Sequence, residues 1–191
     1  AYPISVDPEA LCREARGPAV RRLEAELVPQ GLGSGYTVVQ VARVDPSKNL
    51  LRSLKALELW FDSVPGRASE VRFWGVLPAC RLGASLYRDH LAHVQDLASR
   101  INRRFPGNPV RLFHTHSPER ALACLKHYDL LLVNSLADGM NLVAKEGPLV
   151  NRRDGVLLLS EAAGAFHELV PGALPVHPFD LVGMVDRMEQ A

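Results

Sequence analysis

Two groups of residues in this sequence carry side chains suited to binding an anion. The first is the segment ARVDPSKN, which places Arg43, Asp45 and Lys48 just beyond the apolar run YTVVQV. Two cations beside the start of a helix can hold a diphosphate through charge-assisted hydrogen bonds, and the helix dipole adds to the attraction. Arginines and lysines in loops are more often solvated surface residues. This segment alone leaves both interpretations open.

The second group is DGMNLVAKE, which begins at Asp138 and follows the apolar stretch YDLLLVNSLA directly. Asp138 could cap a helix starting at about residue 139, and Gly139 would let a ligand approach the backbone closely. The N–H groups of residues 140–142 would then face that ligand. Glu146 lies on the same helical face as Leu142, where its carboxylate could accept hydrogen bonds from the vicinal hydroxyls of a ribose. A plain N-cap is the alternative for the aspartate.

Alternating strand-like and helix-like segments would position both groups. The strands are rich in Val and Leu without polar alternation, as in a sheet covered by helices on both faces. The sequence therefore predicts an α/β fold with a doubly wound parallel sheet of about six strands, whose ligands bind beyond the carboxyl ends of the strands. We expect strands over 36–43, 70–76, 109–114, 129–134, 155–160 and 173–177, and helices over 49–63, 85–104, 118–126, from about 139, over 161–169 and from about 180.

Residues 1–35 differ in character from the rest. They hold a charged, helix-like stretch broken at Gly17-Pro18 and then the glycine-rich QGLGSG, which precedes a strand and so lacks the context of a dinucleotide fingerprint. We expect residues 1–35 to form a linker with an adaptor helix, and residues 36–191 to form one α/β domain. The chain opens without a methionine, which suggests a piece of something longer or a processed product.

The composition argues against several classes of protein. Lys and Arg number 22 against 21 Asp and Glu, so the net charge of +1 provides no broad basic field for nucleic acid or an anionic membrane. No apolar run approaches the roughly 20 residues of a membrane span. Cys12, Cys80 and Cys124 match neither a disulfide framework nor a CxxC motif, and His90 with His93 lacks further metal ligands. We expect a cytoplasmic protein that needs no metal or other cofactor.

Several segments resemble one known family. DGMNLVAKE, GVLLLSEAAGAFHEL and VHPFDLVGMVDRM resemble the C-terminal half of the trehalose-6-phosphate synthases, retaining glycosyltransferases of the two-domain GT-B type. VARVDPSKNLLRSLKALE is similar to that family's V-D-R-L-D-Y-x-K-G segment, and YPISVDPEAL to the segment between its two domains. The resemblance runs from about residue 1 to residue 191. It implies the Rossmann-like, nucleotide-sugar-binding domain of such an enzyme, the C-terminal half of the GT-B architecture.

The resemblance also implies a role for each matching residue. Arg43 and Lys48 would bind the diphosphate of the donor and stabilise charge on it as it departs. Together with Asp138 they are the expected catalytic residues, and Glu146 would bind the ribose. The glucose and the phosphates would be held by the intervening residues, namely Asp138, Gly139, Met140 and Asn141 for the sugar, and the backbone N–H groups of Leu142 and Val143 for the phosphates.

The implied reaction moves glucose from UDP-glucose or GDP-glucose to glucose 6-phosphate, giving trehalose 6-phosphate with retention. In the family the acceptor site belongs to the N-terminal domain. We therefore expect this chain to bind the donor, to require the N-terminal domain of the same parent protein as its partner, and to be inactive alone. A homo-oligomer is compatible with the sequence.

The chain also departs from the family pattern. Pro46 and Asn49 stand where the family has Tyr and Gly, and in PACRLGAS the family's Arg is kept as Arg81 while Ala84 replaces an Asp. PLVNRRD and HPFD also look like pseudo-glycosyltransferases that couple cyclitols, although those lack the intact DGMNLVAKE run. The alternatives are such an enzyme, transfer to another phosphorylated polyol or cyclitol, a sugar-nucleotide epimerase of similar architecture, or a non-catalytic sugar-nucleotide-binding module.

Overall fold

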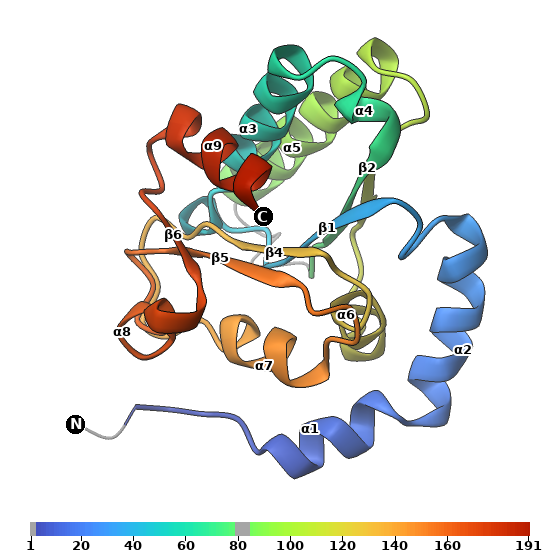
Figure 1. Ribbon diagram of the computed structural model, residues 1–191, viewed down its shortest axis with the longest axis vertical. Coiled ribbons are helices and arrows are strands. Elements are labelled where there is room, and N and C mark those ends of the chain that lie inside the picture. The colour runs from blue at the N-terminus through green and yellow to red at the C-terminus, as the bar shows by residue number, and fades with distance from the viewer. Residues whose placement is uncertain (1–2, 79–84) are drawn as a thin grey trace.

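A parallel sheet of six strands forms the centre of the molecule in the computed structural model, which describes residues 3–78 and 85–191 (Figure 1). The strands run in the order β3-β2-β1-β4-β5-β6. Because the order reverses between β1 and β4, the fold is a Rossmann-like doubly wound sheet, and the expected fold class is confirmed. The bounds are β1 Tyr36–Val41, β2 Val71–Val76, β3 Val110–Phe113, β4 Leu130–Val133, β5 Val156–Ser160 and β6 Leu174–Val176.

Helices cover both faces of the sheet. In Figure 1, α3, α5 and α9 lie over one face, while α6 and α7 lie under the other with α1 and α2 outside them. In the described part of the chain no helix is long and apolar enough to cross a membrane. The helices are α1 Pro8–Ala15, α2 Pro18–Leu27, α3 Leu50–Ser63, α4 Arg67–Glu70, α5 Ser85–Arg104, α6 Pro118–Leu125, α7 Val143–Val150, α8 Phe166–Leu169 and α9 Leu181–Gln190, with short 3-10 helices η1 Val28–Gln30, η2 Pro46–Lys48 and η3 Val170–Gly172.

Two apolar cores, one on each face, hold these layers together. Val38 of β1 packs into the core under α3, α5 and α9, whereas its neighbour Val39 packs into the core formed with α6 and α7. Leu130 and Leu131 of β4 divide between the two cores in the same way. Successive side chains of a strand point to opposite faces, so a strand buried on both faces is apolar at most positions and shows no polar alternation.

The expected strands and most of the expected helices are found, but two helices differ at the edge that carries the candidate site. The helix expected from about residue 139 begins at Val143 with Leu142 in the N-cap position, so Asp138 does not cap it and that interpretation was wrong. The helix expected over 161–169 is reduced to α8, because residues 161–165 form turns that pack against the backbone of residues 138–140. Arg81 and Ala84 lie outside the described residues.

The part of the chain before β1 forms two helices, α1 and α2, that pack on the α/β domain. Their apolar side chains Ala15, Val20 and Leu27 are buried in the core shared with α6 and α7. Lys126 donates hydrogen bonds to the Ala15 carbonyl at 3.0 Å and to Glu24 at 2.5 Å, which ties both helices to the domain. The division of the chain between residues 35 and 36 stays a prediction.

Candidate functional site

A cavity of about 630 Å³ opens where β1 and β4 end, at the point where the strand order reverses. Open α/β sheets bind their ligands in this position. All the predicted site residues except Glu146 line the cavity, which is bounded by Pro3, Ile4, Val41, Ala42, Arg43, Lys48, Asp138, Gly139, Met140, Asn141, Leu142 and Val143. The fold thus brings together two segments that are 90 residues apart in the sequence.

The loop after β1 carries the two cations. Asp45 caps η2 by accepting a hydrogen bond from the Ser47 N–H at 2.9 Å. Burial would raise the pKa of Asp45, but the hydrogen bonds from Ser47 and the charges of Arg43 and Lys48 lower it below its usual value. The ionised carboxylate therefore orders the turn that places Lys48 in the cavity wall.

Asn49 ends that turn in a conformation that explains its departure from the family pattern. Its φ of 59° and ψ of 29° are left-handed, a region that glycine and asparagine adopt most readily. Its side-chain amide also donates a hydrogen bond to the Pro178 carbonyl at 2.7 Å, beyond the end of β6. Asparagine can therefore replace glycine here with less backbone strain than most other residues, and it connects the loop to the opposite half of the sheet.

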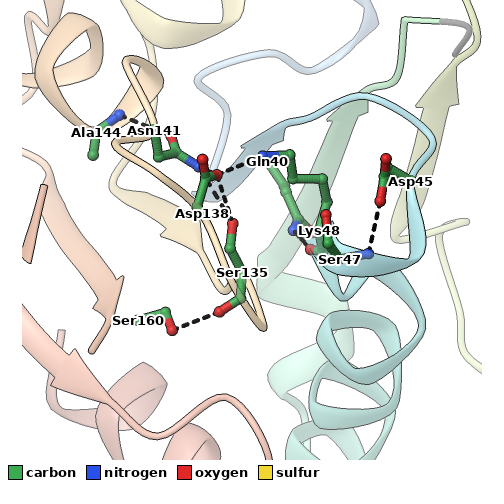
Figure 2. Close-up of polar contacts among 9 residues, drawn as sticks. All are labelled: Gln40, Asp45, Ser47, Lys48, Ser135, Asp138, Asn141, Ala144 and Ser160. Atoms are coloured by element: carbon green, nitrogen blue, oxygen red, sulfur yellow. Dashed lines mark hydrogen bonds and ion pairs between the residues drawn. The ribbon is translucent and has the colours of Figure 1, made fainter. Parts of the chain in front are cut away.

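An ion pair lies at the centre of the site. Lys48 Nζ is 2.5 Å from Asp138 Oδ2, and each side chain is only 13% exposed. Figure 2 shows that the same carboxylate oxygen accepts hydrogen bonds from Ser135 Oγ at 3.2 Å and Asn141 Nδ2 at 3.0 Å. Burial would raise the pKa of Asp138, but these bonds, that of Lys48 foremost, hold it below its usual value. A fixed negative charge thus lies next to a cation on the cavity wall.

Asn141 connects this carboxylate to the start of α7. Its backbone is left-handed, with φ at 69°, and its Oδ1 accepts a hydrogen bond from the Ala144 N–H at 3.3 Å. The first N–H groups of a helix have no partner within it and carry the positive end of the helix dipole. Leu142 and Val143, at the start of α7, line the cavity. The geometry suits an anion in this position.

Two glycines where the 138–140 loop meets the 161–165 turn have different roles. Gly164 donates its N–H to the Asp138 carbonyl at 2.9 Å, and a Cβ added to it would lie 2.1 Å from the Gly139 oxygen, so only glycine fits. A Cβ added to Gly139 would meet no protein atom within 4 Å, and the φ of Gly139 is not in the left-handed region. Neither packing nor backbone conformation requires glycine at 139, so the backbone there is open to the close approach of a ligand.

Sequence reasoning missed the hydroxyl groups that support Asp138. Ser160 Oγ donates to the Ser135 carbonyl at 2.7 Å, and Ser135 in turn donates to Asp138, as drawn in Figure 2. Both serines are buried. The available signal was a serine at or just beyond the end of an apolar strand, in VLLLS and LLVNS. Such positions lie at the carboxyl edge of the sheet, where ligands bind.

Glu146 lies in the first turn of α7, half-buried, and does not line the cavity. Burial, followed by the charge of Glu14 on α1, raises its pKa. A half-buried carboxylate kept in an unfavourable environment is typical of functional sites, but its contact with a ribose stays a prediction. Among residues 3–78 and 85–191, no group of three or more His, Cys, Asp and Glu side chains could hold a metal ion.

The sheet and its cavity define a Rossmann-like α/β domain with an anion-suited site at the switch point. The family model for glycosyltransferase family 20 matches residues 1–191, and the chain belongs to that family. It is 35% identical over 197 residues to the trehalose-6-phosphate synthase of Sodalis glossinidius, a match that covers all of this chain and 41% of the relative. The family resemblance inferred from the motifs is therefore confirmed.

Solved structures agree with this assignment. An alpha,alpha-trehalose-phosphate synthase (UDP-forming) from Burkholderia xenovorans, in complex with glucose-6-phosphate, is 31% identical with a TM-score of 0.90, and it matches all of this chain over 43% of its own. An Escherichia coli protein bound with UDP-2-fluoro glucose is 30% identical with a TM-score of 0.87, again over 43% of its own chain. The present chain thus spans about two fifths of the length of the proteins it resembles.

Proposed function

We propose that this chain is the donor-binding domain of a retaining glycosyltransferase that moves glucose from UDP-glucose or GDP-glucose to glucose 6-phosphate, giving trehalose 6-phosphate. The observation that carries the proposal is the cavity at the switch point, which is lined by Arg43, by the Lys48–Asp138 ion pair and by the start of α7. Relatives named trehalose-6-phosphate synthase support the reaction. We place the acceptor site in an N-terminal domain of the parent protein, and we therefore propose that this chain alone is inactive.

In the proposed mechanism the donor diphosphate lies against Arg43, Lys48 and the first N–H groups of α7. These groups stabilise the negative charge that grows on the diphosphate as its bond to the anomeric carbon of glucose breaks. An ammonium group has three donors, so Lys48 can contact a phosphate oxygen while it keeps its hydrogen bond to Asp138. The Asp138 carboxylate, already ionised, then accepts hydrogen bonds from glucose hydroxyls.

Titration calorimetry with UDP, GDP, UDP-glucose and GDP-glucose tests this proposal directly. We expect saturable binding that favours one nucleotide, and Arg43→Ala should weaken it at least tenfold, because a hydrogen bond from a charged group contributes about 1.5–3 kcal/mol. Arg22→Ala, which removes an exposed arginine of α2, is the matched control and should bind normally. The proposal fails if neither this chain nor the complete parent protein binds any of the four ligands.

Gly139→Ala separates folding from ligand binding. The added methyl group meets no protein atom, so the thermal stability of the chain should stay within about 0.5 kcal/mol of the unaltered value. The same methyl group projects into space that the proposed donor occupies, and we expect UDP-glucose or GDP-glucose to bind about tenfold more weakly. Differential scanning fluorimetry and calorimetry on the same sample provide both values. Unchanged donor affinity would show that the sugar does not approach this position.

A further inference from the structure

A second lysine lies beside the cavity, in the first turn of α7, and it is more deeply buried than Lys48. Lys145 is 8% exposed and donates hydrogen bonds to the two carboxylate oxygens of Glu168 at 3.0 and 2.9 Å and to the carbonyl of Ile4 at 3.2 Å. Glu168 belongs to α8. Ile4 is 141 residues away from the lysine and belongs to residues 3–7, the stretch before α1 that we call the leading segment. One ammonium group therefore joins three separate parts of the chain.

The leading segment forms part of the cavity wall. Pro3 and Ile4 line the same cavity as Arg43, Lys48 and residues 138–143. In Figure 1 this segment runs past α8 and α7 before it enters α1, outside the layered body of the domain. Ile4 is 62% exposed and therefore contributes little to the apolar core. Its backbone is held by the hydrogen bond from Lys145.

Packing alone does not explain a lysine at position 145. A buried ammonium group loses its hydration, and apolar replacements of buried ion pairs are often neutral or stabilising. Glu168, whose side chain is 43% exposed, remains partly hydrated with or without its partner. An unbranched apolar side chain would therefore serve the contact between α7 and α8 at least as well. The property that a lysine adds is its reach to the Ile4 carbonyl.

We propose that Lys145 is a positioning residue that holds Pro3 and Ile4 as an apolar wall for the nucleoside part of a bound nucleoside diphosphate. The inference rests on the proposed function, because it assumes that the diphosphate lies at Arg43, Lys48 and the start of α7. Pro3 and Ile4 offer apolar surface, which suits the faces of a base or a ribose better than a phosphate. The leading segment is thereby part of the donor site.

Calorimetry with UDP and GDP on Lys145→Met and Lys145→Arg tests the inference. For the nucleotide that binds the unaltered chain, Lys145→Met should weaken binding about tenfold while the melting temperature changes little. Lys145→Arg retains the charge and the donors, and it should remain within about threefold of the unaltered affinity. Lys55→Met, which removes an exposed lysine of α3, should have no effect on binding.

A double-mutant cycle with Ile4→Ala distinguishes positioning from a general structural role. In the unaltered chain Ile4→Ala should weaken nucleotide binding about threefold, whereas in Lys145→Met it should add nothing, because the wall has already been released. Val182→Ala on α9, with a comparable exposure of 64%, is the control for losing an exposed apolar side chain. Additive effects, or normal binding by Lys145→Met, would overturn the inference and leave the proposed function standing. Absence of binding by the unaltered chain and by its parent would overturn both.

Discussion

Gly164→Ala is expected to lower the free energy of unfolding by about 1–3 kcal/mol and to abolish nucleotide binding. The new Cβ would lie 2.1 Å from the Gly139 oxygen and 2.8 Å from its carbonyl carbon, and a backbone group cannot rotate out of the way. The turn that contains Gly164 has to move. Its hydrogen bonds to the Asp138 and Met140 carbonyls are then lost, and the loop that forms the cavity wall loses its support.

The matched control for this substitution is Gly172→Ala. A Cβ added at Gly172, at the end of η3, meets no atom within 4 Å, and the residue is not left-handed. The unfolding free energy of the Gly172→Ala variant should therefore differ from that of the unaltered chain by less than about 0.5 kcal/mol. Urea unfolding followed by circular dichroism, with calorimetry for nucleotide affinity, compares the two variants. If Gly164→Ala behaved like the control in both measurements, the close packing of the two loops would be wrong.

Lys48→Met is expected to weaken nucleotide binding about a hundredfold and to destabilise the chain. The first effect follows because the substitution removes a cation from the proposed diphosphate site. The second follows because Asp138 remains as a carboxylate, 13% exposed, without its nearest charge partner. Breaking a fully buried pair costs about 3–5 kcal/mol, and this partly hydrated pair should cost about 2–3 kcal/mol. Lys55→Met again provides the comparison for loss of one exposed positive charge.

The pH dependence of the stability lost in Lys48→Met identifies the source of that loss. The folded-state pKa of Asp138 is lowered, so the pair contributes stability above the ordinary aspartate pKa of about 3.9 and loses it as the pH falls through the lowered value. The difference in unfolding free energy between the unaltered chain and Lys48→Met should be constant near neutral pH and shrink as acid protonates Asp138. Urea unfolding between pH 3 and pH 7 measures it. A difference that grows in acid would exclude the ion pair as its cause.

Much of the fold could be predicted because the strands are buried on both faces. YTVVQV and LLLV lack the polar alternation of a half-exposed strand, as expected in a sheet covered by two layers of helices, and the sequence places turn-forming residues between them. The candidate site could be located in the same way. Arg43 and Asp138 follow two such strands, and the carboxyl ends of parallel strands share one edge of the sheet.

The details that could not be predicted depend on partners far away in the sequence. Asp138 has the local appearance of an N-cap, but its carboxylate forms an ion pair with Lys48, 90 residues earlier. The helix starts only after Asn141, whose backbone is left-handed. The segment EAAGAFHEL has helical periodicity, yet its small residues are used for contact with the loop at Gly139. The hydrogen bond from Lys145 to Ile4 likewise has no local signal.

The position of α2 also has a consequence for the synthesis of this chain on the ribosome. Val20 and Leu27 are buried against the α6 side of the sheet, and Glu24 pairs with Lys126, 102 residues further along. A ribosome that adds about 5–20 residues per second takes roughly 5–20 s to cover that separation. For this interval the nascent α2 lacks α6 and the nascent β1 lacks β4. The growing polypeptide therefore exposes apolar surface that chaperones can bind, before residues 138–143 have been added to complete the cavity.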